Sequence, residues 1–237
     1  MFAVLTTIDD LMQITEIYKS IQGEASYTGM PCVFIRLSTC NLRCTWCDSE
    51  FTFTGGKKMT PEEVEAEVQR LAPEGLVEIT GGEPMLQEKE VIPFMQRLLD
   101  LGYKVLLETS GERPLADVPA SVIKIMDVKC PGSGEGASFR MDNLDALMPR
   151  DEVKFVITDR RDYEFARDFA LKNGLSGRVG NVIFSPAFKK DAAGGRDASQ
   201  CMVDPRELAG WILADGLEVR LGLQMHKFIW QPETRGV

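Results

Sequence analysis

The sequence Cys32-Val33-Phe34-Ile35-Arg36-Leu37 runs directly into Ser38-Thr39-Cys40-Asn41-Leu42-Arg43-Cys44-Thr45-Trp46-Cys47. β-Branched and aromatic residues are frequent in the first part, which therefore predicts a β-strand. The second part opens a polar, glycine-containing stretch that extends to residue 58 and predicts a long loop. Because loops of this length inside a compact domain usually carry function, we expect a site where this strand ends.

Short β-rich runs alternate with amphipathic patterns along the rest of the chain. The predicted helices span residues 60–71, 88–101, 162–173 and 204–214. The predicted strands span residues 14–19, 32–37, 76–80, 103–108, 122–127, 152–158, 179–184 and 217–221. This rhythm predicts an α/β fold with a parallel sheet. About six β-α units fit, so we expect an open, partial parallel β/α barrel that forms one domain over residues 1–237.

Sites in such folds lie at the carboxyl ends of the parallel strands. Three distinctive segments follow predicted strands here. The cysteine loop at residues 38–58 follows the second strand, Gly81-Gly82-Glu83-Pro84 follows the third, and Glu108-Thr109-Ser110-Gly111 follows the fourth. We therefore expect these segments to meet at one edge of the sheet.

The composition argues against several classes of partner. The 237 residues carry a formal net charge of -9 and no basic stripe, which argues against nucleic acid. No apolar run approaches the roughly 20 residues that cross a bilayer. Residues 1–12 lack the basic start of a signal peptide, so we expect a cytoplasmic protein without a membrane partner. In that compartment the six cysteines suit free thiols or metal ligands better than disulfides.

Cys40, Cys44 and Cys47 have C-x3-C-x2-C spacing. A [4Fe–4S] cluster normally takes four thiolates, so three on one loop predict a cluster with one open iron. An open iron can chelate the amino and carboxylate groups of S-adenosylmethionine, whose reductive cleavage gives a 5′-deoxyadenosyl radical. The alternative is a structural zinc site completed by Cys130, although zinc sites usually pair two C-x2-C units or add histidines, and His226 is the only histidine.

The same loop resembles the signature of the radical S-adenosylmethionine superfamily. That signature places an aromatic residue before the last cysteine, and Trp46 occupies this position. The run Gly81-Gly82-Glu83-Pro84 resembles the second hallmark of the superfamily, which binds the methionine amino group through backbone at a strand edge. The resemblance therefore implies that Trp46, Gly81, Gly82 and Glu83 contact S-adenosylmethionine.

Five segments in order resemble the 7-carboxy-7-deazaguanine synthase family within this superfamily. They are Ser20-Ile21-Gln22-Gly23-Glu24, Phe34-Ile35-Arg36-Leu37, Cys47-Asp48-Ser49, Gly81-Gly82-Glu83-Pro84-Met85-Leu86-Gln87 and Gln224-Met225-His226-Lys227-Phe228-Ile229-Trp230. The resemblance implies a radical lyase that converts 6-carboxy-5,6,7,8-tetrahydropterin to 7-carboxy-7-deazaguanine with loss of ammonia, in queuosine or other 7-deazapurine biosynthesis. It also implies that S-adenosylmethionine is regenerated, that Mg²⁺ is required, that flavodoxin or ferredoxin donates electrons, and that the enzyme is a homodimer.

The residue types agree with that chemistry. Arg36 offers paired donors for the substrate carboxylate, although a strand arginine can also face solvent. Ser49 offers a hydroxyl oxygen to Mg²⁺, or it only turns the loop. Gln22, Glu24 and Gln87 suit the donor-rich edge of the pterin. The alternatives are ordinary surface positions for Gln22 and Glu24, and a helix start for Gln87.

The remaining assignments rest mainly on the resemblance. A lone histidine is more often structural, but the family has a substrate-contacting histidine at the position of His226, within a C-terminal segment at residues 222–237. Glu108 and Ser110 match a family position near the ribose of S-adenosylmethionine. Lys129 matches in part and is placed on the adenosine side. The run 132–136 predicts a flexible loop that could act as a lid.

Two other functional classes stay open on the sequence alone. An enzyme that activates a glycyl-radical enzyme has the same cysteine trio but a protein substrate, and it gives no role to residues 20–24 or to His226. A non-enzymatic iron–sulfur or zinc module predicts a saturated metal site without affinity for S-adenosylmethionine. Titration with the carboxypterin tests the first, and spectra with and without S-adenosylmethionine test the second.

Overall fold

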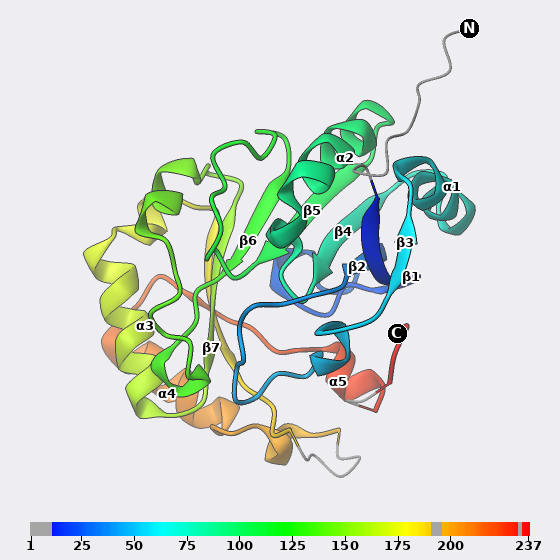
Figure 1. Cartoon of the computed structure of the whole chain (residues 1–237). Helices are drawn as coiled ribbons and strands as arrows, with labels where there is room; N and C mark the ends of the chain where they lie inside the picture. The colour runs from blue at the N-terminus through cyan, green and yellow to red at the C-terminus, as the bar shows by residue number, and fades with distance from the viewer. Residues whose placement is uncertain (1–10, 191–195, 232–233) are drawn as a thin grey trace, which may run out of the picture.

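The computed structural model describes residues 11–190, 196–231 and 234–237. Within these ranges nine strands form one sheet in the order β3-β1-β2-β4-β5-β6-β7-β8-β9. The parallel strands are β2 (Pro31–Leu37), β4 (Leu76–Gly81), β5 (Lys104–Thr109), β6 (Ile123–Asp127), β7 (Glu152–Ile157), β8 (Asn181–Pro186) and β9 (Arg220–Leu221). The strands β3 and β9 stand at the two ends of the order, so the sheet is open and the predicted partial barrel is confirmed (Figure 1).

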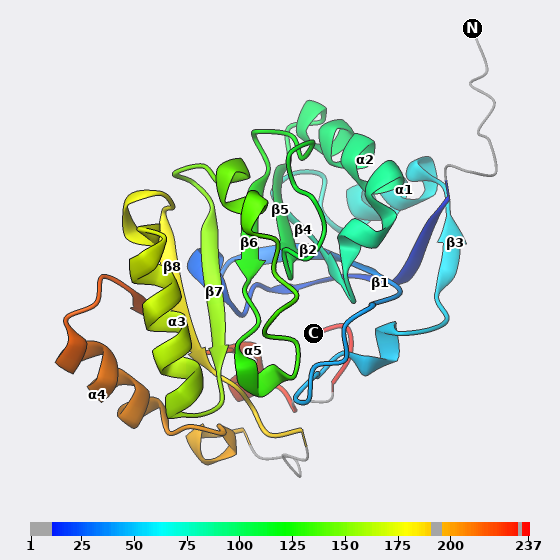
Figure 2. The same ribbon diagram turned by 60° about the vertical axis from the view of Figure 1, so that its left-hand side comes forward.

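The four longer helices lie against the outer face of the curved sheet (Figures 1 and 2). They are α1 (Pro61–Leu71), α2 (Glu88–Asp100), α3 (Arg160–Lys172) and α4 (Pro205–Asp215). A capping box begins α1, since Thr60 Oγ1 accepts from Glu63 N at 3.2 Å and Glu63 accepts from Thr60 N at 2.9 Å. These helices confirm the four predicted from the sequence, with boundaries that shift by one or two residues.

The N-terminal part differs from the expected series of parallel strands. β1 (Met12–Ile21) is longer than the predicted strand and pairs antiparallel with β2. Residues 57–59 of the predicted loop form a short strand, β3 (Lys57–Met59), which also pairs antiparallel with β1. The crossovers from β5 to β6 and from β6 to β7 contain no α-helix. Pro114 and Pro119 in the first of these connections interrupt any continuous helix.

The two faces of the sheet have different contents because side chains alternate along each strand. On β4, Val77 and Ile79 pack with the helices in the main apolar core. Leu76 points to the other face and joins a smaller apolar cluster with Cys32, Phe34, Leu106, Ile123 and Ile125. Glu78 and Thr80, on that same face, lie nearer the carboxyl end of the strand and line a cavity. The inner face is therefore apolar at one end and polar at the other.

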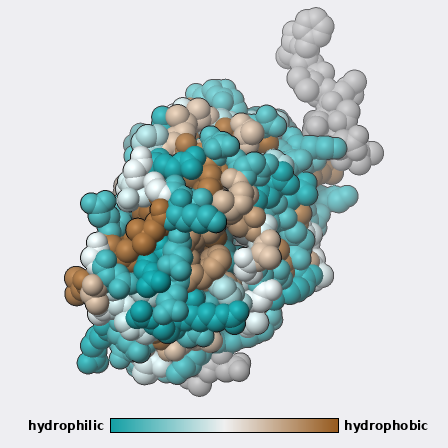
Figure 3. Space-filling model, turned by 90° about the vertical axis from the view of Figure 1, so that its left-hand side faces the viewer, coloured by the Kyte–Doolittle hydropathy of each residue, from teal (hydrophilic) through white to brown (hydrophobic). Residues whose placement is uncertain are grey.

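The outer face that carries α3 and α4 is largely hydrophilic, with scattered apolar groups (Figure 3). No helix in the described ranges is long and apolar enough to cross a membrane. Residues 1–10, on which the expectation about a signal peptide mainly rests, and residues 232–233 of the predicted C-terminal segment lie outside the described residues.

Candidate active site

A cavity of about 480 Å³ opens at the carboxyl ends of the parallel strands. The cluster loop, the ends of β4 to β7 and the C-terminal segment all contribute to its wall. The site residues predicted from the sequence that line it are Gln22, Glu24, Arg36, Cys40, Cys44, Trp46, Cys47, Ser49, Gly81, Gly82, Glu108, Ser110, Lys129 and His226. Glu83 and Gln87 are the predicted residues that do not line it.

The three cysteines of the loop are partly buried and face this cavity. Burial raises the pKa of Cys40, and it raises the pKa of Cys44 to about 11. Insertion of a cluster must therefore release protons from these thiols. Among the described residues, no group of three or more His, Cys, Asp or Glu side chains is arranged to hold a single metal ion. The thiolates of a [4Fe–4S] cluster each bind a different iron and need no such arrangement.

The loop after β6 supports the cluster loop through hydrogen bonds. The carbonyl oxygens of Gly132 and Ser133 accept from Thr45 Oγ1 at 2.9 Å and Thr45 N at 3.0 Å. Glu135 Oε1 accepts from Arg43 N at 2.6 Å. The buried Asp162 in turn accepts from Gly132 N at 2.7 Å. The run 132–136, predicted as a flexible loop, is thus bonded on both sides.

The two glycines after β4 allow the backbone to lie against the chain that precedes Cys40. A Cβ on Gly82 would lie 2.1 Å from Thr39 O, and a Cβ on Gly81 would lie 2.4 Å from Leu37 O. Gly81 also has a φ of 148°, which L side chains rarely adopt. Any side chain at these positions would separate β4 from the cluster loop.

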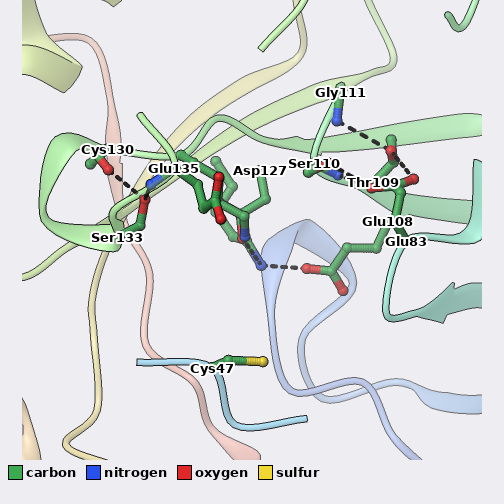
Figure 4. Close-up of polar contacts among 12 residues, drawn as sticks. Cys47, Glu83, Glu108, Thr109, Ser110, Gly111, Asp127, Cys130, Ser133 and Glu135 are labelled. Carbon is green, nitrogen blue, oxygen red and sulfur yellow. Dashed lines mark hydrogen bonds and ion pairs between the residues drawn. The ribbon is translucent and has the colours of Figure 1, made fainter. Parts of the chain in front are cut away.

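Glu83 directs its side chain at the neighbouring loop, and its contact with S-adenosylmethionine stays a prediction. Its buried carboxylate accepts from Met85 N at 3.0 Å, Thr109 Oγ1 at 2.7 Å, Ser110 N at 2.8 Å and Ser110 Oγ at 2.6 Å. Figure 4 shows this side chain directed at Thr109 and Ser110. Burial raises the pKa of Glu83, against the opposing effect of these donors. The carboxylate joins the loops after β4 and β5, while Ser110 Oγ keeps lone pairs for a hydroxyl in the cavity.

Two polar atoms at the cavity have no partner among the described residues. They are the indole nitrogen of Trp46 and Oδ1 of Asp127, both buried. Asp127 Oδ2 accepts from Lys129 Nζ at 2.8 Å, and Lys129 lies 5.1 Å from the centroid of the Trp46 ring. Because buried polar atoms are normally paired, these atoms fit a ligand with both acceptors and donors, such as S-adenosylmethionine.

Arg36, on β2, also lines the cavity. Its Nε donates to Glu16 Oε1 at 2.9 Å and its Nη2 donates to Tyr18 Oη at 2.7 Å. Burial opposes the charge on Arg36, but Tyr18 and Glu16 raise its pKa. The guanidinium has five N–H donors, so donors remain for a carboxylate in the cavity.

The segments around Glu24 and His226 are in contact although they are far apart in the sequence. Met225 N donates to Gly23 O at 2.8 Å, and Gln224 Nε2 donates to Glu24 Oε1 at 2.8 Å. Burial lowers the pKa of His226, which favours a neutral imidazole. Burial disfavours the charge on Glu24, but the ammonium group of Lys154 lowers its pKa to about 2. The pair therefore offers an anionic acceptor beside a neutral ring.

Gly23 sets the place of His226, and its replacement by alanine has a large expected effect. The new Cβ would lie 2.2 Å from Nδ1 and 2.8 Å from Cβ of His226, so the whole residue must move. Because the resemblance gives His226 a contact with the substrate, we expect Gly23→Ala to raise the KM for a pterin by up to about ten-fold, since one hydrogen bond is worth about 0.5–1.5 kcal/mol. Steady-state kinetics checks this. The control is Gly210→Ala, where a Cβ meets nothing within 4 Å; an unchanged KM in Gly23→Ala would contradict the placement.

Ser49 and Asp48 lie beside the last cysteine. Ser49 Oγ is 3.9 Å from Cys47 Sγ, and Asp48 Oδ2 is 2.6 Å from Lys227 Nζ. Burial disfavours the charge on Asp48, but Lys227 lowers the pKa of this carboxyl well below its usual range. A hydroxyl next to an ionised carboxylate suits a hard cation such as Mg²⁺.

Gln87 is bonded to the protein outside the cavity. Its Oε1 accepts from Gln13 N at 2.7 Å, and its Nε2 donates to Gln13 O and Ser38 O at 3.2 and 3.1 Å. These bonds fix β1 to the start of the cluster loop. A contact between Gln87 and substrate therefore stays a prediction without geometric support.

The structure adds cavity residues that the sequence reasoning missed. They include Glu78, Asp127, Lys154 and Lys227. A signal for some of them was present, because Glu78 and Lys154 are charged residues inside otherwise apolar parallel strands. Such strands normally read as continuous hydrophobic runs. A charge in that context indicates a polar interior.

Comparison with known proteins agrees with this geometry. The family model described as Radical SAM superfamily matches residues 34–127. The chain is 70% identical over 226 residues to the 7-carboxy-7-deazaguanine synthase of Koribacter versatilis (strain Ellin345), covering 95% of this chain and 100% of the relative. It is 37% identical to the synthase of Chlorobaculum tepidum, covering 95% and 97%.

Solved structures show the same fold at lower sequence identity. QueE from Escherichia coli matches with a TM-score of 0.68 and 22% identity, over 93% of this chain and 100% of that one. A radical SAM methyltransferase from Sphaerobacter thermophilus matches with a TM-score of 0.57 and 18% identity, over 90% and 73%. The full-length relatives, together with the cysteine loop at the carboxyl ends of the strands, establish that the chain is a radical SAM enzyme and belongs to the 7-carboxy-7-deazaguanine synthase family.

Proposed function

We propose that the chain converts 6-carboxy-5,6,7,8-tetrahydropterin to 7-carboxy-7-deazaguanine with loss of ammonia. The observation that carries this proposal is that Arg36, Glu24 and His226 line the same cavity as the three cysteines. A cation, an anion and a neutral imidazole there match a substrate with a carboxylate at one end and N–H donors at the other. A protein substrate, as expected for an enzyme that activates a glycyl-radical enzyme, would leave these groups without a role.

In this proposal the chain's main contribution is positioning. Cys40, Cys44 and Cys47 hold the cluster, which together with S-adenosylmethionine supplies a 5′-deoxyadenosyl radical when bound. Arg36 holds the substrate carboxylate, while Glu24 accepts hydrogen bonds from the N–H edge of the pterin. Fixing both ends of a small ring limits its motion, and a reactive radical needs a target held in one place.

The proposal extends to a cation and to partners. Ser49 would bind Mg²⁺ through its hydroxyl, with Asp48 and the substrate carboxylate nearby. Flavodoxin or ferredoxin would supply the electron, the enzyme would work as a cytoplasmic homodimer, and its product would feed queuosine or another 7-deazapurine. Family membership supports these points.

Anaerobic incubation tests the function directly. The reconstituted protein is mixed with 6-carboxytetrahydropterin, dithionite, Mg²⁺ and substoichiometric S-adenosylmethionine. We expect 7-carboxy-7-deazaguanine and ammonia in equal amounts, each in excess over S-adenosylmethionine, and a marked loss of rate when Mg²⁺ is removed by chelation. Cleavage of S-adenosylmethionine without conversion of the pterin would overturn the proposed substrate, and a rate independent of Mg²⁺ would overturn the cation site.

A further inference from the structure

Lys154, on β7, lies among three acidic side chains at the floor of the cavity. Its ammonium group is 2.6 Å from Glu24 Oε2 and 3.8 Å from Asp127 Oδ2, and it also bonds Glu108 Oε1. Only 3% of its side chain is exposed. Figure 4 shows Glu108 and Asp127 reaching toward a common point from neighbouring strands. Lys154 thus links three residues that come from three other segments of the chain.

The partly buried charges around Lys154 do not balance without it. Glu24, Glu108 and Asp127 line the cavity, and the lysines that contact them are Lys154 and Lys129. Lys129 is bonded to Asp127. Burial and the neighbouring Glu108 raise the pKa of Glu78 well above its usual value, so Glu78 adds no fixed charge. Lys154 therefore serves both Glu24 and Glu108, and uncompensated carboxylates held away from water would take up protons rather than stay charged.

We propose that Lys154 is a positioning residue for substrate recognition: it holds Glu24 and Glu108 as paired anionic acceptors for the N–H edge of the substrate. The inference rests on the proposed function and names a determinant of it. Gln224, in the C-terminal segment, donates a hydrogen bond to the other carboxylate oxygen of Glu24, Oε1, and so helps to fix its orientation. Glu108, expected beside the ribose of S-adenosylmethionine, is thereby tied to the same lysine as the proposed pterin contact. A ligand with adjacent N–H donors, of the amidine or guanidine class, fits two fixed carboxylates.

The second buried lysine of the sheet provides a matched control. Lys124, on β6, is 2.8 Å from Asp151, and their side chains are 2% and 0% exposed. Neither residue lines the cavity. Lys124→Met thus removes a buried ion pair of similar burial without touching the floor of the site. Both variants are expected to lose stability, but only Lys154→Met is expected to lose substrate affinity.

The pH dependence separates recognition from a purely structural role. The charged or titratable groups around Glu24 are Lys154, His226, Glu78, Glu108 and Asp127. With Lys154 present, Glu24 stays ionised through the neutral range, since its pKa is depressed to about 2. Without Lys154, burial raises the pKa of Glu24. Affinity should then be lost as the pH falls and recover as it rises, whereas the pH profile of Lys124→Met should follow that of the wild type.

The experiment measures KM and kcat for 6-carboxytetrahydropterin on cluster-loaded protein from pH 6 to 9. We expect Lys154→Met to raise KM about ten- to a hundred-fold at neutral pH, as for loss of hydrogen bonds to charged groups. Cleavage of S-adenosylmethionine in the absence of pterin is measured on the same protein and should fall less than pterin turnover, because Lys154 is expected to act mainly through Glu24 at the pterin. Lys154→Arg, which keeps the charge but moves it, should give a smaller rise that does not depend on pH.

The possible results are distinct. A wild-type KM in either Lys154 variant overturns the inference, as does an equal loss of pterin turnover and of uncoupled cleavage in both lysine variants. If Lys154→Met does not retain a cluster, the KM of Lys154→Arg decides instead, and a wild-type KM in that variant overturns the inference. Failure of the wild-type enzyme to convert the pterin would instead overturn the proposed function, so the two failures cannot be confused.

Discussion

Replacement of Cys44 by alanine is expected to abolish formation of 5′-deoxyadenosine by the anaerobically reconstituted protein. With Cys40 and Cys47 as the remaining ligands of the loop, a second iron would lose its thiolate, and the cluster would be held too weakly to persist. Cys44 is also the residue after which the loop turns, since Cys47 N donates to Cys44 O at 3.2 Å. The measurement is 5′-deoxyadenosine per protein by chromatography, with iron content and visible absorbance of the same sample.

Cys201→Ala is the matched control for that substitution. Cys201 is a buried free thiol that does not line the cavity, so its loss should leave both cluster content and cleavage near wild type. Retained cleavage in Cys44→Ala would remove the basis for the cluster assignment. Equal loss in both variants would show that thiol burial, rather than iron binding, matters to the protein.

Replacement of Arg36 by alanine is expected to weaken binding of the carboxypterin while leaving cluster absorbance intact. Glu16 and Tyr18 hold the guanidinium in place, so its free N–H donors are fixed before the substrate arrives. Loss of hydrogen bonds to a charged group costs about 1.5–3 kcal/mol, or about ten- to a hundred-fold in Kd. Equilibrium titration with the carboxypterin under anaerobic conditions measures the change.

Two further variants define the cause of the Arg36 effect. Arg36→Lys keeps a positive charge but loses the planar pair of donors, so we expect an intermediate Kd. Arg97→Ala removes a surface arginine that also bonds two carboxylates, Glu62 and Glu65, and should leave Kd unchanged. A wild-type Kd in Arg36→Ala would exclude Arg36 as the carboxylate ligand.

Local patterns predicted the elements of this fold well. The β-rich runs of the strands and the amphipathic patterns of the helices each depend on residues close in sequence. The antiparallel course of β1 could not be found in this way, because strand direction depends on which neighbour the strand pairs with. β3 was missed for the same reason, since its Lys57-Lys58-Met59 sequence has no apolar alternation and only its pairing with β1 makes it a strand.

The site residues divide in the same way, into those found from contiguous motifs and those found only from contacts between distant segments. Most of the site residues that the cysteine spacing and the family segments indicated line the cavity, because those motifs are contiguous. The contacts of the Glu83 and Gln87 side chains could not be predicted from the sequence, since backbone and hydroxyl donors of neighbouring segments bond them. Lys154 was missed because its partners Glu24 and Glu108 are 130 and 46 residues away in the chain.

The sequence by itself determined the chemistry of the cysteine loop, the α/β class and the family, because each rests on short stretches whose residue types and spacing are constrained. Only the tertiary structure decided how Arg36, Glu24, Lys154 and His226 share one cavity with Cys40, Cys44 and Cys47. The physical reason is that burial and partner charges set the protonation and direction of each side chain. Those quantities depend on the strands and loops that fold against it, from distant parts of the chain.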